Sequence, residues 1–417
     1  MSATSKPRRD SVDPAVKRAR LAVAILFVLN GLALANLIPW YPVIKGDLEM
    51  SNTVFGIAVA GFAFGALVFG TLSGPLIARF GSARTSTVWA VVMAAVLPLI
   101  AIAPNPWTLA LAMVGMGSAD AIMDAAMNAH GLRVQRRYGR SIINSFHALW
   151  SAGAVVGGLV GSLVIGAGVP RSVHLLVVAI VVAGVAVATS GWLLPGAENT
   201  ERAAEATAGD GGGLVDAWRV APLVLLGLGV IMMASTALED TAGTWSGVYL
   251  KDVVGAPAAT LGLGFVASQG LMFVGRIFGD RVVDRFGPSL VARTGLLLSA
   301  AGITLVVLSS SSLAGVIIGF GLSGLGASTI YPLGVTASAE IPGVRSGDGI
   351  TIVTWLARVG FLAVPPAIGA VADAASLPIA LTMVVAAAVG GSFLAGLLRP
   401  PDPDASQPHA DEQPTGA

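Results

Sequence analysis

Acidic residues inside long apolar segments are the residues of this chain best suited to do chemistry. Asp120 and Asp124 lie four residues apart and Asn128 follows after another four, so a helix would place all three on one face. An ionisable side chain is energetically costly in lipid and normally faces the protein interior or a water-filled cavity. A carboxylate in that position can bind and release a proton, and we expect Asp120 or Asp124 to do so.

His147 and a second acidic pair extend the set of candidate proton-binding groups. His147 is expected at a depth similar to that of Asp124, in the next apolar segment, and histidine titrates closest to neutral pH. A contact between the two would serve either proton transfer or only the packing of two neighbouring helices, and the sequence leaves both open. Glu239 and Asp240 lie together in the outer part of a later segment.

Arg358 is the only basic residue expected near the middle of an apolar segment, and a lone guanidinium there needs a partner. We expect it to reach Glu239 or Asp120. An anionic group of a substrate would then replace that acid, because the planar guanidinium can hold a carboxylate with two hydrogen bonds. A permanent structural ion pair is the equal alternative. The other polar residues that are candidates for substrate binding are Asn30, Asn128, Trp245, Gln269 and Tyr331.

Apolar segments long enough to cross a bilayer must position these residues. Hydrophobic residues make up 55% of the 417, and charged residues only 11%, whereas soluble domains carry about 25% charge. In lipid each spanning segment must satisfy its own backbone hydrogen bonds, so we expect helices. The sequence predicts an all-α membrane protein with twelve transmembrane helices, at 20–44, 53–77, 85–104, 106–130, 141–168, 172–194, 219–250, 256–283, 288–309, 311–338, 346–372 and 375–398.

One short loop sequence occurs twice, 206 residues apart. Its copies, 74–81 and 280–287, each follow the second apolar segment of a six-segment half. Internal repeats of this kind are typical of membrane transporters whose binding site lies between the repeats. We therefore expect two pseudo-symmetric six-helix halves. The expected organisation is a cytoplasmic tail, the first half, a cytoplasmic linker, the second half and a second cytoplasmic tail, at 1–19, 20–194, 195–218, 219–398 and 399–417.

The repeated loop resembles the signature of the major facilitator superfamily, Gly-x-Leu-x-Asp-Arg-x-Gly followed by basic residues. The resemblance implies a conformational latch, formed here by Gly74, Arg79, Gly81, Asp280, Asp284, Arg285 and Gly287. The first copy has Ala78 where the family has Asp, so Asp284 with Arg285 is the better candidate. The alternative is that the arginines of both loops only anchor the inner face of the protein.

Two further stretches, 124–129 and 145–151, are similar to a branch of uncharacterised bacterial facilitators related to fucose:proton symporters, and 239–250 fits that branch too. The resemblance implies secondary active transport of a small solute by alternating access, and the acids in the spans favour coupling to protons. The sugar symporters place acids in the first and fourth spans. This chain has only Asn30 and Asn36 in the first, so a sugar substrate does not follow.

Lysine and arginine are unevenly distributed between alternate loops. With the N-terminus inside, the predicted outer loops hold only three of the 24 basic residues, Lys45, Arg171 and Lys251. Cytoplasmic loops of membrane proteins carry an excess of Lys and Arg. We therefore expect a multi-pass protein of the cytoplasmic (inner) membrane with both termini in the cytoplasm.

Composition excludes several kinds of site. Cysteine is absent, which excludes disulfides and thiolate metal ligands. The four histidines lack metal-ligand spacing, and no phosphate-binding loop occurs. We expect no catalytic residue, metal, cofactor or nucleic-acid partner, and a monomer in the lipid bilayer that binds a small-molecule substrate and protons.

Three alternatives remain open at the level of sequence. The first is a multidrug or metabolite efflux pump of the same fold, although the polar residues along the spans favour a polar or charged substrate. The second is a non-transporting membrane sensor. The third, a membrane-embedded enzyme, would need a nucleophile–base pair or a metal cluster, and the sequence offers neither beyond an Asp124–His147 contact.

Small residues and prolines give further expectations about the helices. Glycines four residues apart let helices approach closely, and they occur at 61 and 65 and at 153, 157 and 161. We expect these ridges to serve packing. Pro332 predicts a bend in the tenth helix, and Pro365–Pro366 predicts a local break in the eleventh.

Overall fold

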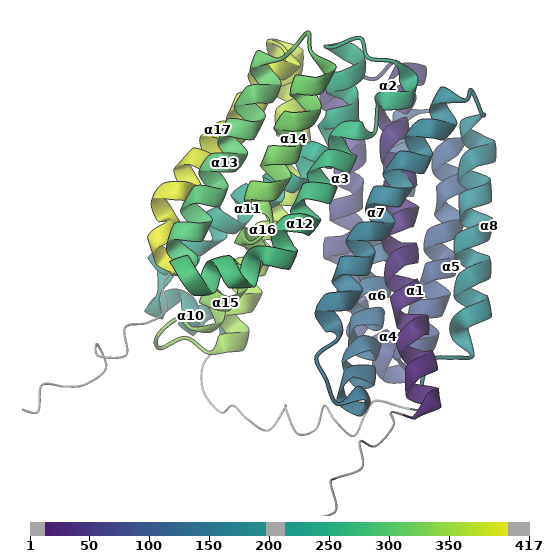
Figure 1. The fold of residues 1–417 in the computed structure, drawn as a ribbon, viewed down its shortest axis with the longest axis vertical. Helices are drawn as coiled ribbons and strands as arrows, with labels where there is room; N and C mark the ends of the chain where they lie inside the picture. The colour runs from purple at the N-terminus through teal and green to yellow at the C-terminus, as the bar shows by residue number, and fades with distance from the viewer. Residues whose placement is uncertain (1–12, 197–212, 399–417) are drawn as a thin grey trace, which may run out of the picture. The chain divides into compact units, whose positions relative to one another are not determined.

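The computed structural model describes residues 13–196 and 213–398, and every regular element within these ranges is a helix (Figure 1). In this described part of the chain, twelve helical segments are long and apolar enough to cross a membrane. The predicted all-α fold with twelve transmembrane helices is therefore confirmed.

The first six spans are built from eight α-helices and two short 3₁₀ turns. They are α1 (Pro14–Leu37), η1 (Ile38–Trp40), α2 (Tyr41–Asp47), α3 (Asn52–Phe69), η2 (Gly70–Leu72), α4 (Ser73–Phe80), α5 (Ser82–Ala101), α6 (Pro106–Tyr138), α7 (Ile143–Gly166) and α8 (Arg171–Ser190). Helix α1 begins at Pro14, so the end of the expected tail 1–19 is helical, while residues 1–12 lie outside the described part.

The last six spans follow a short helix, α10. The elements are α10 (Leu214–Val220), α11 (Pro222–Asp252), η3 (Ala258–Thr260), α12 (Leu263–Phe286), α13 (Pro288–Leu308), α14 (Leu313–Ala327), α15 (Ile330–Ala339), α16 (Ser346–Ala374), α17 (Leu377–Leu394) and η4 (Ala395–Leu398). Most of the expected linker, 197–212, and the expected tail 399–417 lie outside the described residues.

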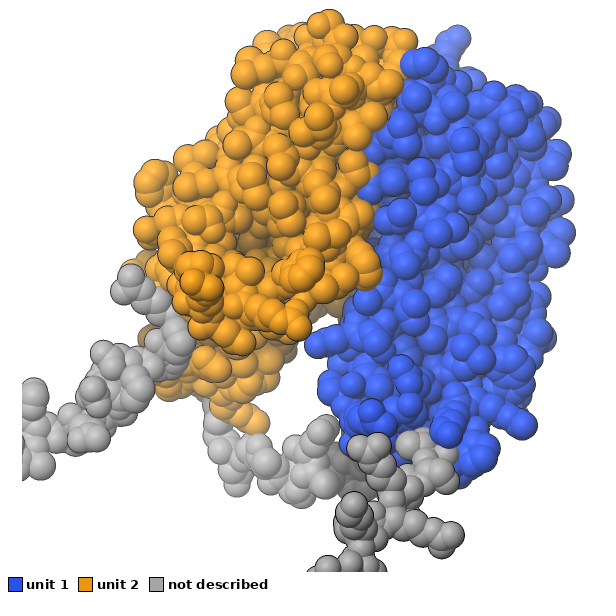
Figure 2. All heavy atoms as spheres, in the orientation of Figure 1, with its two compact units in different colours: residues 1–50, 57–208, 257–266 blue, residues 51–56, 209–256, 267–417 orange. Residues whose placement is uncertain are grey.

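The chain forms two compact units of helices (Figure 2). Unit 1 comprises 1–50, 57–208 and 257–266, and unit 2 comprises 51–56, 209–256 and 267–417. Unit 2 thus takes residues 51–56 from the first half of the chain, and unit 1 takes residues 257–266 from the second; we call these the exchanged segments. Their first residues are separated by the same 206 positions as the two loop copies. The internal repeat read from the sequence therefore has a counterpart in the way the units are composed.

The repeated loop has the same backbone conformation in both copies. Gly81 has φ 80° and ψ 154°, and Gly287 has φ 80° and ψ 152°. This region is open almost only to glycine. In each copy the arginine two residues before the glycine lies over the next phenylalanine ring, at 5.2 Å for Arg79 and 5.4 Å for Arg285. The two loops thus end one helix and begin the next in the same way.

Glycine ridges bring pairs of helices into backbone contact, as the sequence predicts. In α3, a Cβ atom on Gly61 would lie 2.7 Å from the carbonyl oxygen of Ala110 in α6. In α7, a Cβ atom on Gly157 would lie 2.7 Å from the carbonyl oxygen of Leu32, and Gly153 contacts the backbone of Val28 in α1. Only glycine permits this approach.

The proline predictions have different outcomes. The tenth span is divided between α14 and α15, and the second helix starts at Ile330, two residues before Pro332. The predicted break at Pro365–Pro366 is wrong, because α16 continues from Ser346 to Ala374 through both prolines. Pro365 is buried and its backbone lies against Gly56, so packing holds the helix across the missing N–H groups.

Asp373, in the last turn of α16, holds the first turn of α3 within unit 2. Its Oδ1 accepts a hydrogen bond from the backbone N–H of Asn52 at 2.8 Å. Its Oδ2 accepts from the N–H and the hydroxyl of Thr53 at 2.8 and 2.6 Å. The first N–H groups of a helix have no partner inside the helix, so this carboxylate acts as a cap supplied by another helix.

We expect Asp373→Ala to lower the free energy of unfolding by about 1 kcal/mol, because two backbone donors lose their acceptor. Thermal unfolding of the purified protein in detergent would measure it. Asp280→Ala is the matched control, since Asp280 is exposed and has no hydrogen bond within the described ranges. Equal melting temperatures for the Asp373→Ala protein and the wild type would contradict the capping role.

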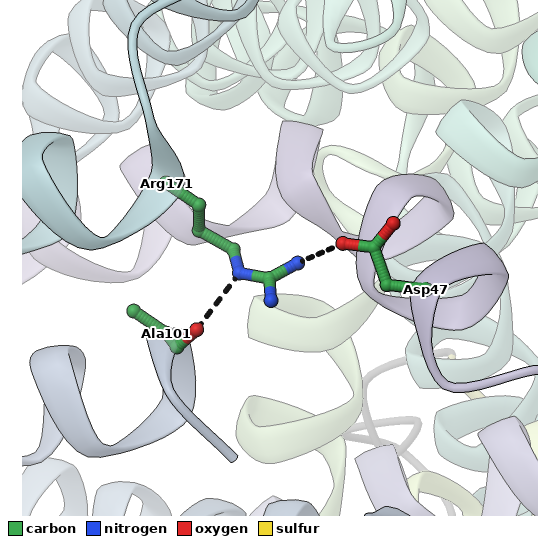
Figure 3. A network of polar contacts seen from close by, with 3 residues as sticks. All are labelled: Asp47, Ala101 and Arg171. Carbon is green, nitrogen blue, oxygen red and sulfur yellow. Dashed lines mark hydrogen bonds and ion pairs between the residues drawn. The ribbon is translucent and has the colours of Figure 1, made fainter. Parts of the chain in front are cut away.

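One arginine connects three helix ends in unit 1. The Nε of Arg171, the first residue of α8, donates to the carbonyl oxygen of Ala101 at 3.0 Å (Figure 3). Its Nη1 forms an ion pair with Asp47 at 2.8 Å. Arg171 is one of the three basic residues expected in outer loops, and it ties α8 to the ends of α2 and α5.

Candidate functional site

Three residues from three helices of unit 1 form a hydrogen-bonded group, which we call the Asp120 centre: Asn30 of α1, Asp120 of α6 and Trp150 of α7. The Nδ2 of Asn30 donates to Oδ1 of Asp120 at 2.8 Å. The indole Nε1 of Trp150 donates to Oδ1 of Asn30 at 2.7 Å. Asn30 is buried, and the other two residues are half-buried.

Close helix packing places Asn30 between its two partners. Gly31 in α1 and Gly153 in α7 lie against the backbones of Trp150 and Val28, respectively, so the two helices touch at this level. Two methionine side chains also contact the amide of Asn30. The sulfur atoms of Met93 and Met123 lie 3.8 and 3.7 Å from its Nδ2.

The carboxyl group of Asp120 has a neutral partner and forms no ion pair with a basic residue in the described part of unit 1. A donated hydrogen bond stabilises a carboxylate but leaves its negative charge in place. A charge inside an apolar helix bundle is costly without an opposite charge. The group can remove this cost by binding a proton, which is the chemistry that the sequence predicts for it.

Asp124 and Asn128 continue the same face of α6. The Nδ2 of Asn128 donates to a carboxylate oxygen of Asp124 at 2.9 Å and to its carbonyl oxygen at 2.9 Å. Asp124 is exposed in the isolated protein. His147 is also exposed, and its ring packs edge-on against Phe27 of α1 with the centroids 5.2 Å apart.

In unit 2, polar atoms of α11 and α12 are buried without a hydrogen-bond partner among the described residues. They are Oδ2 of Asp240, Nε1 of Trp245 and Oε1 of Gln269. The other oxygen of Asp240 accepts from the hydroxyl of Thr244 at 3.1 Å. Glu239 is half-buried beside it. Buried polar atoms are nearly always paired in folded proteins, so these three positions are open to a polar ligand or water.

Arg358 does not pair with Glu239, one of the two acids that the sequence suggests as its partner. It is exposed on α16 and forms no ion pair with Glu239 or another described acid of unit 2. Another face of α16 packs on α11, where the carbonyl oxygen of Ala357 accepts a hydrogen bond from the hydroxyl of Thr236 at 3.3 Å. The depth of Arg358 along the helix could be read from the sequence, whereas the face on which it lies could not. Tyr331, at the start of α15, is also exposed.

The latch residues of the two loop copies share a backbone motif. Asp280, Asp284 and Arg285 are exposed, and within the described part of unit 2 none of them forms a hydrogen bond or an ion pair. Gly74 lies within α4, and Arg79 near its end is exposed. The conserved feature of both copies in this structure is the glycine conformation at Gly81 and Gly287 described above.

Sequence reasoning did not find Trp150 as a partner of Asn30, nor the polar group at the C-terminal end of α1. In that group His174 of α8 bonds Asn36 at 3.1 Å and accepts from the Nε1 of Trp40 at 2.9 Å. These partners are more than 100 residues apart in the chain. No local pattern marks such pairs; polar residues within apolar spans were the only available signal.

Comparison with known families agrees with this architecture. The model of the Major Facilitator Superfamily matches residues 23–288 and again 224–416, so it covers most of the chain. The chain belongs to the Major Facilitator Superfamily. It is therefore a multi-pass membrane protein of a transporter family, as the repeated loop and the twelve spans predict.

Two relatives of this facilitator align over nearly its whole length. An uncharacterized transporter of Sinorhizobium fredii, y4wD, is 32% identical over 377 residues, 90% of this chain and 97% of that protein. The membrane protein MosC of Rhizobium meliloti is 33% identical over 380 residues, 90% of this chain and 89% of its own.

Solved structures share the fold of this facilitator at low sequence identity. The nucleoside transporter NupG superposes with a TM-score of 0.74 at 12% identity, over 91% of this chain and 99% of that one. A bacterial homolog of the human lysosomal transporter Spinster, in an inward-facing and unoccupied conformation, has a TM-score of 0.73 at 13% identity, over 93% and 98%. At these identities the likeness establishes the fold alone.

Proposed function

We propose that this facilitator is a secondary active transporter that moves a small solute across the cytoplasmic membrane by alternating access and is coupled to protons. The observation that carries the proposal is the Asp120 centre, in which a carboxyl group within the spans is bonded to a neutral amide and to no basic residue in the described part of unit 1. Such a group can bind a proton when it is open to one side and release it when it is open to the other.

The roles of the other acidic residues follow from their surroundings. Asp124 and His147, exposed on α6 and α7, are candidates for the path of the proton to Asp120. Asp240 is bonded to Thr244 and retains one open oxygen, so with Glu239 it is the corresponding candidate in unit 2. We propose no catalytic residue, metal or cofactor.

The open hydrogen-bonding positions of unit 2 support a polar substrate. Trp245 offers a donor, and Gln269 and Asp240 offer acceptors, so a compound with both donor and acceptor groups would satisfy them. The exposed guanidinium of Arg358 favours a substrate that also carries an anionic group. Asn30, Asn128 and Tyr331 remain candidates for further contacts. Kinship with fucose:proton symporters remains part of this proposal, although the first span lacks their acid.

Gln269→Met is expected to stabilise the protein and to weaken substrate binding. Methionine has a similar shape, so the change removes an unpaired buried oxygen, which we expect to raise the free energy of unfolding by about 1 kcal/mol. The KM of transport should rise severalfold if that oxygen accepts a bond from substrate.

Gln135→Met is the matched control for Gln269→Met. The Oε1 of Gln135 accepts bonds from the backbone N–H groups of Ile142 and Ile143 at 2.8 and 3.0 Å. Gln135→Met should destabilise the protein and leave the KM of transport unchanged. A Gln269→Met protein that has the KM of the wild type would remove Gln269 from the binding site.

Uptake by proteoliposomes tests the proposed function directly. Purified protein is supplied with a panel of labelled sugars, other polar metabolites and amphipathic drugs, with and without a pH gradient. Accumulation of a polar compound only with the gradient is the expected result. Accumulation of drugs alone would favour the efflux pump, and no gradient-dependent flux of any compound would favour a sensor.

The proposed orientation has its own test. Since the chain contains no cysteine, a single cysteine introduced at position 208 reacts with a membrane-impermeant maleimide only from the side it faces. We expect no labelling from outside intact cells, because the loops rich in Lys and Arg should face the cytoplasm. A cysteine introduced at position 255 is the control that should be labelled. Labelling of position 208 from outside would reverse the orientation.

A further inference from the structure

We propose that Trp150 is the positioning residue of the Asp120 centre: it fixes the amide of Asn30 and transmits the protonation state of Asp120 to helix α7. This inference rests on the proposed role of Asp120 as the proton site. It assigns a function to a residue of α7 that does not itself bind the proton.

Trp150 determines which end of the Asn30 amide faces Asp120. An asparagine side chain has one end that accepts and one that donates, and it can present either to a neighbour. The indole nitrogen of Trp150 can only donate, and it lies 2.7 Å from Oδ1 of Asn30. The amide oxygen is therefore held by Trp150, and only the NH₂ end remains for Asp120, at 2.8 Å.

The charge on Asp120 must change the strength of both hydrogen bonds. A bond to an ionised carboxylate is markedly stronger than one to its neutral form. Hydrogen bonds in a chain polarise one another, more so in a medium of low dielectric constant. Proton binding at Asp120 therefore weakens the Asn30 bond and, through it, the bond that Trp150 donates.

The chain of hydrogen bonds from Asp120 through Asn30 to Trp150, which we call the relay, ends on α7. This helix makes a further contact within unit 1. Helix α7 packs on α1 through Gly153 and Gly157. Near its other end, the hydroxyl oxygen of Ser162 accepts a hydrogen bond from the N–H of Gly262 at 3.0 Å. Gly262 belongs to the exchanged segment 257–266. A displacement of α7 that follows proton binding would therefore reach this segment.

The indole N–H signals of the purified, full-length protein test the relay without any substrate. The chain has eight tryptophans, and Trp150→Phe identifies the signal of Trp150 in a two-dimensional NMR spectrum of isotope-labelled protein. We expect this signal to shift as the pH is changed, and the shift to be lost in Asp120→Asn and in Asn30→Ala.

Neighbouring ionisable groups and a second tryptophan supply the controls. Asp124, one turn from Asp120 on α6, and His147, three residues before Trp150 on α7, are the titratable groups nearest to the centre along these two helices. The shift must persist in Asp124→Asn and His147→Gln. Trp40 donates its indole N–H to His174 at 2.9 Å and not to the Asp120 centre. The chemical shift of its indole N–H should therefore depend on pH in the same way in the wild type and in Asp120→Asn. A Trp150 signal that does not respond to pH, or that still responds in Asp120→Asn, would overturn the relay.

Charge displacement after a pH jump, recorded with purified protein on a solid-supported membrane, separates the two proposals. Trp150→Phe should displace the same total charge as the wild type, but the pH at which half of this charge is displaced should shift. If Trp150 served only packing, the substitution would leave this pH midpoint unchanged. Trp107 is an exposed residue of α6, the helix that carries Asp120, and Trp107→Phe should leave the pH midpoint unchanged. A charge that needs Asp120 but has the same midpoint in Trp150→Phe would overturn the relay alone, and a charge independent of Asp120 would overturn the proposed function.

Discussion

Asp120→Asn is expected to abolish solute accumulation driven by a pH gradient while exchange of labelled for unlabelled solute continues without a gradient. The amide has the shape of the carboxyl group and can accept the same bond from Asn30, so the fold should survive. It cannot bind a proton at physiological pH, so the step that couples proton movement to transport is lost. Proteoliposomes loaded with a transported compound allow both fluxes to be measured on the same preparation.

Asp47→Asn is the matched control for this experiment. Asp47 is also a carboxylate of unit 1, but its side chain is 55% exposed and paired with Arg171. An exposed ion pair contributes at most about 1 kcal/mol, and we expect both fluxes to remain. Gradient-driven accumulation at the wild-type level in Asp120→Asn would exclude this residue from proton coupling.

Gly153→Ala is expected to have the largest effect on stability. A single methyl group at this position would meet the backbone carbonyl of Val28, and backbone cannot turn aside as a flexible side chain does. Overpacking of this kind destabilises proteins by about 1–3 kcal/mol. Because α1 and α7 would be forced apart beside Asn30, the Asp120 centre should be disturbed too. Thermal unfolding of purified protein and the amount of protein in the membrane would measure the loss.

Gly184→Ala separates a steric effect from a general effect of glycine replacement. Gly184 lies within α8, and a Cβ atom there would have no neighbour within 4 Å. Alanine is the better helix former, so we expect unchanged or slightly higher stability. If Gly153→Ala and Gly184→Ala lowered the stability by similar amounts, the close contact between α1 and α7 could not be the cause of the destabilisation.

The spans and the repeat could be predicted because their signals are local. Each span needs only a long apolar run, and the repeated loop needs only a glycine where the backbone has φ near 80°. The bend predicted from Pro332 falls in the tenth span, which the structure divides between α14 and α15 just before this residue. The break at Pro365–Pro366 was not borne out, because contacts with Gly56, far away in the chain, hold α16.

The candidate site could be predicted only in part. Asp120, Asp124 and Asn128 stand out because polar residues are rare in spans, and their common face follows from helix periodicity. Asn30, the partner of the Asp120 carboxyl group, is 90 residues away, and Trp150 is 120 residues from Asn30, so no periodic pattern identifies them. The pairing of Arg358 with Glu239 is absent for a related reason, since the sequence gives the position of a residue along a helix but not the helix that its face meets.

The central claim is that the carboxyl group of Asp120 binds the coupled proton. Charge displacement after a rapid pH jump, measured on solid-supported membranes without substrate in wild-type, Asp47→Asn and Asp120→Asn proteins, tests it most directly. We predict a transient proton-binding current in the wild type and in Asp47→Asn that is lost in Asp120→Asn. A current of the same size in all three proteins would contradict the claim.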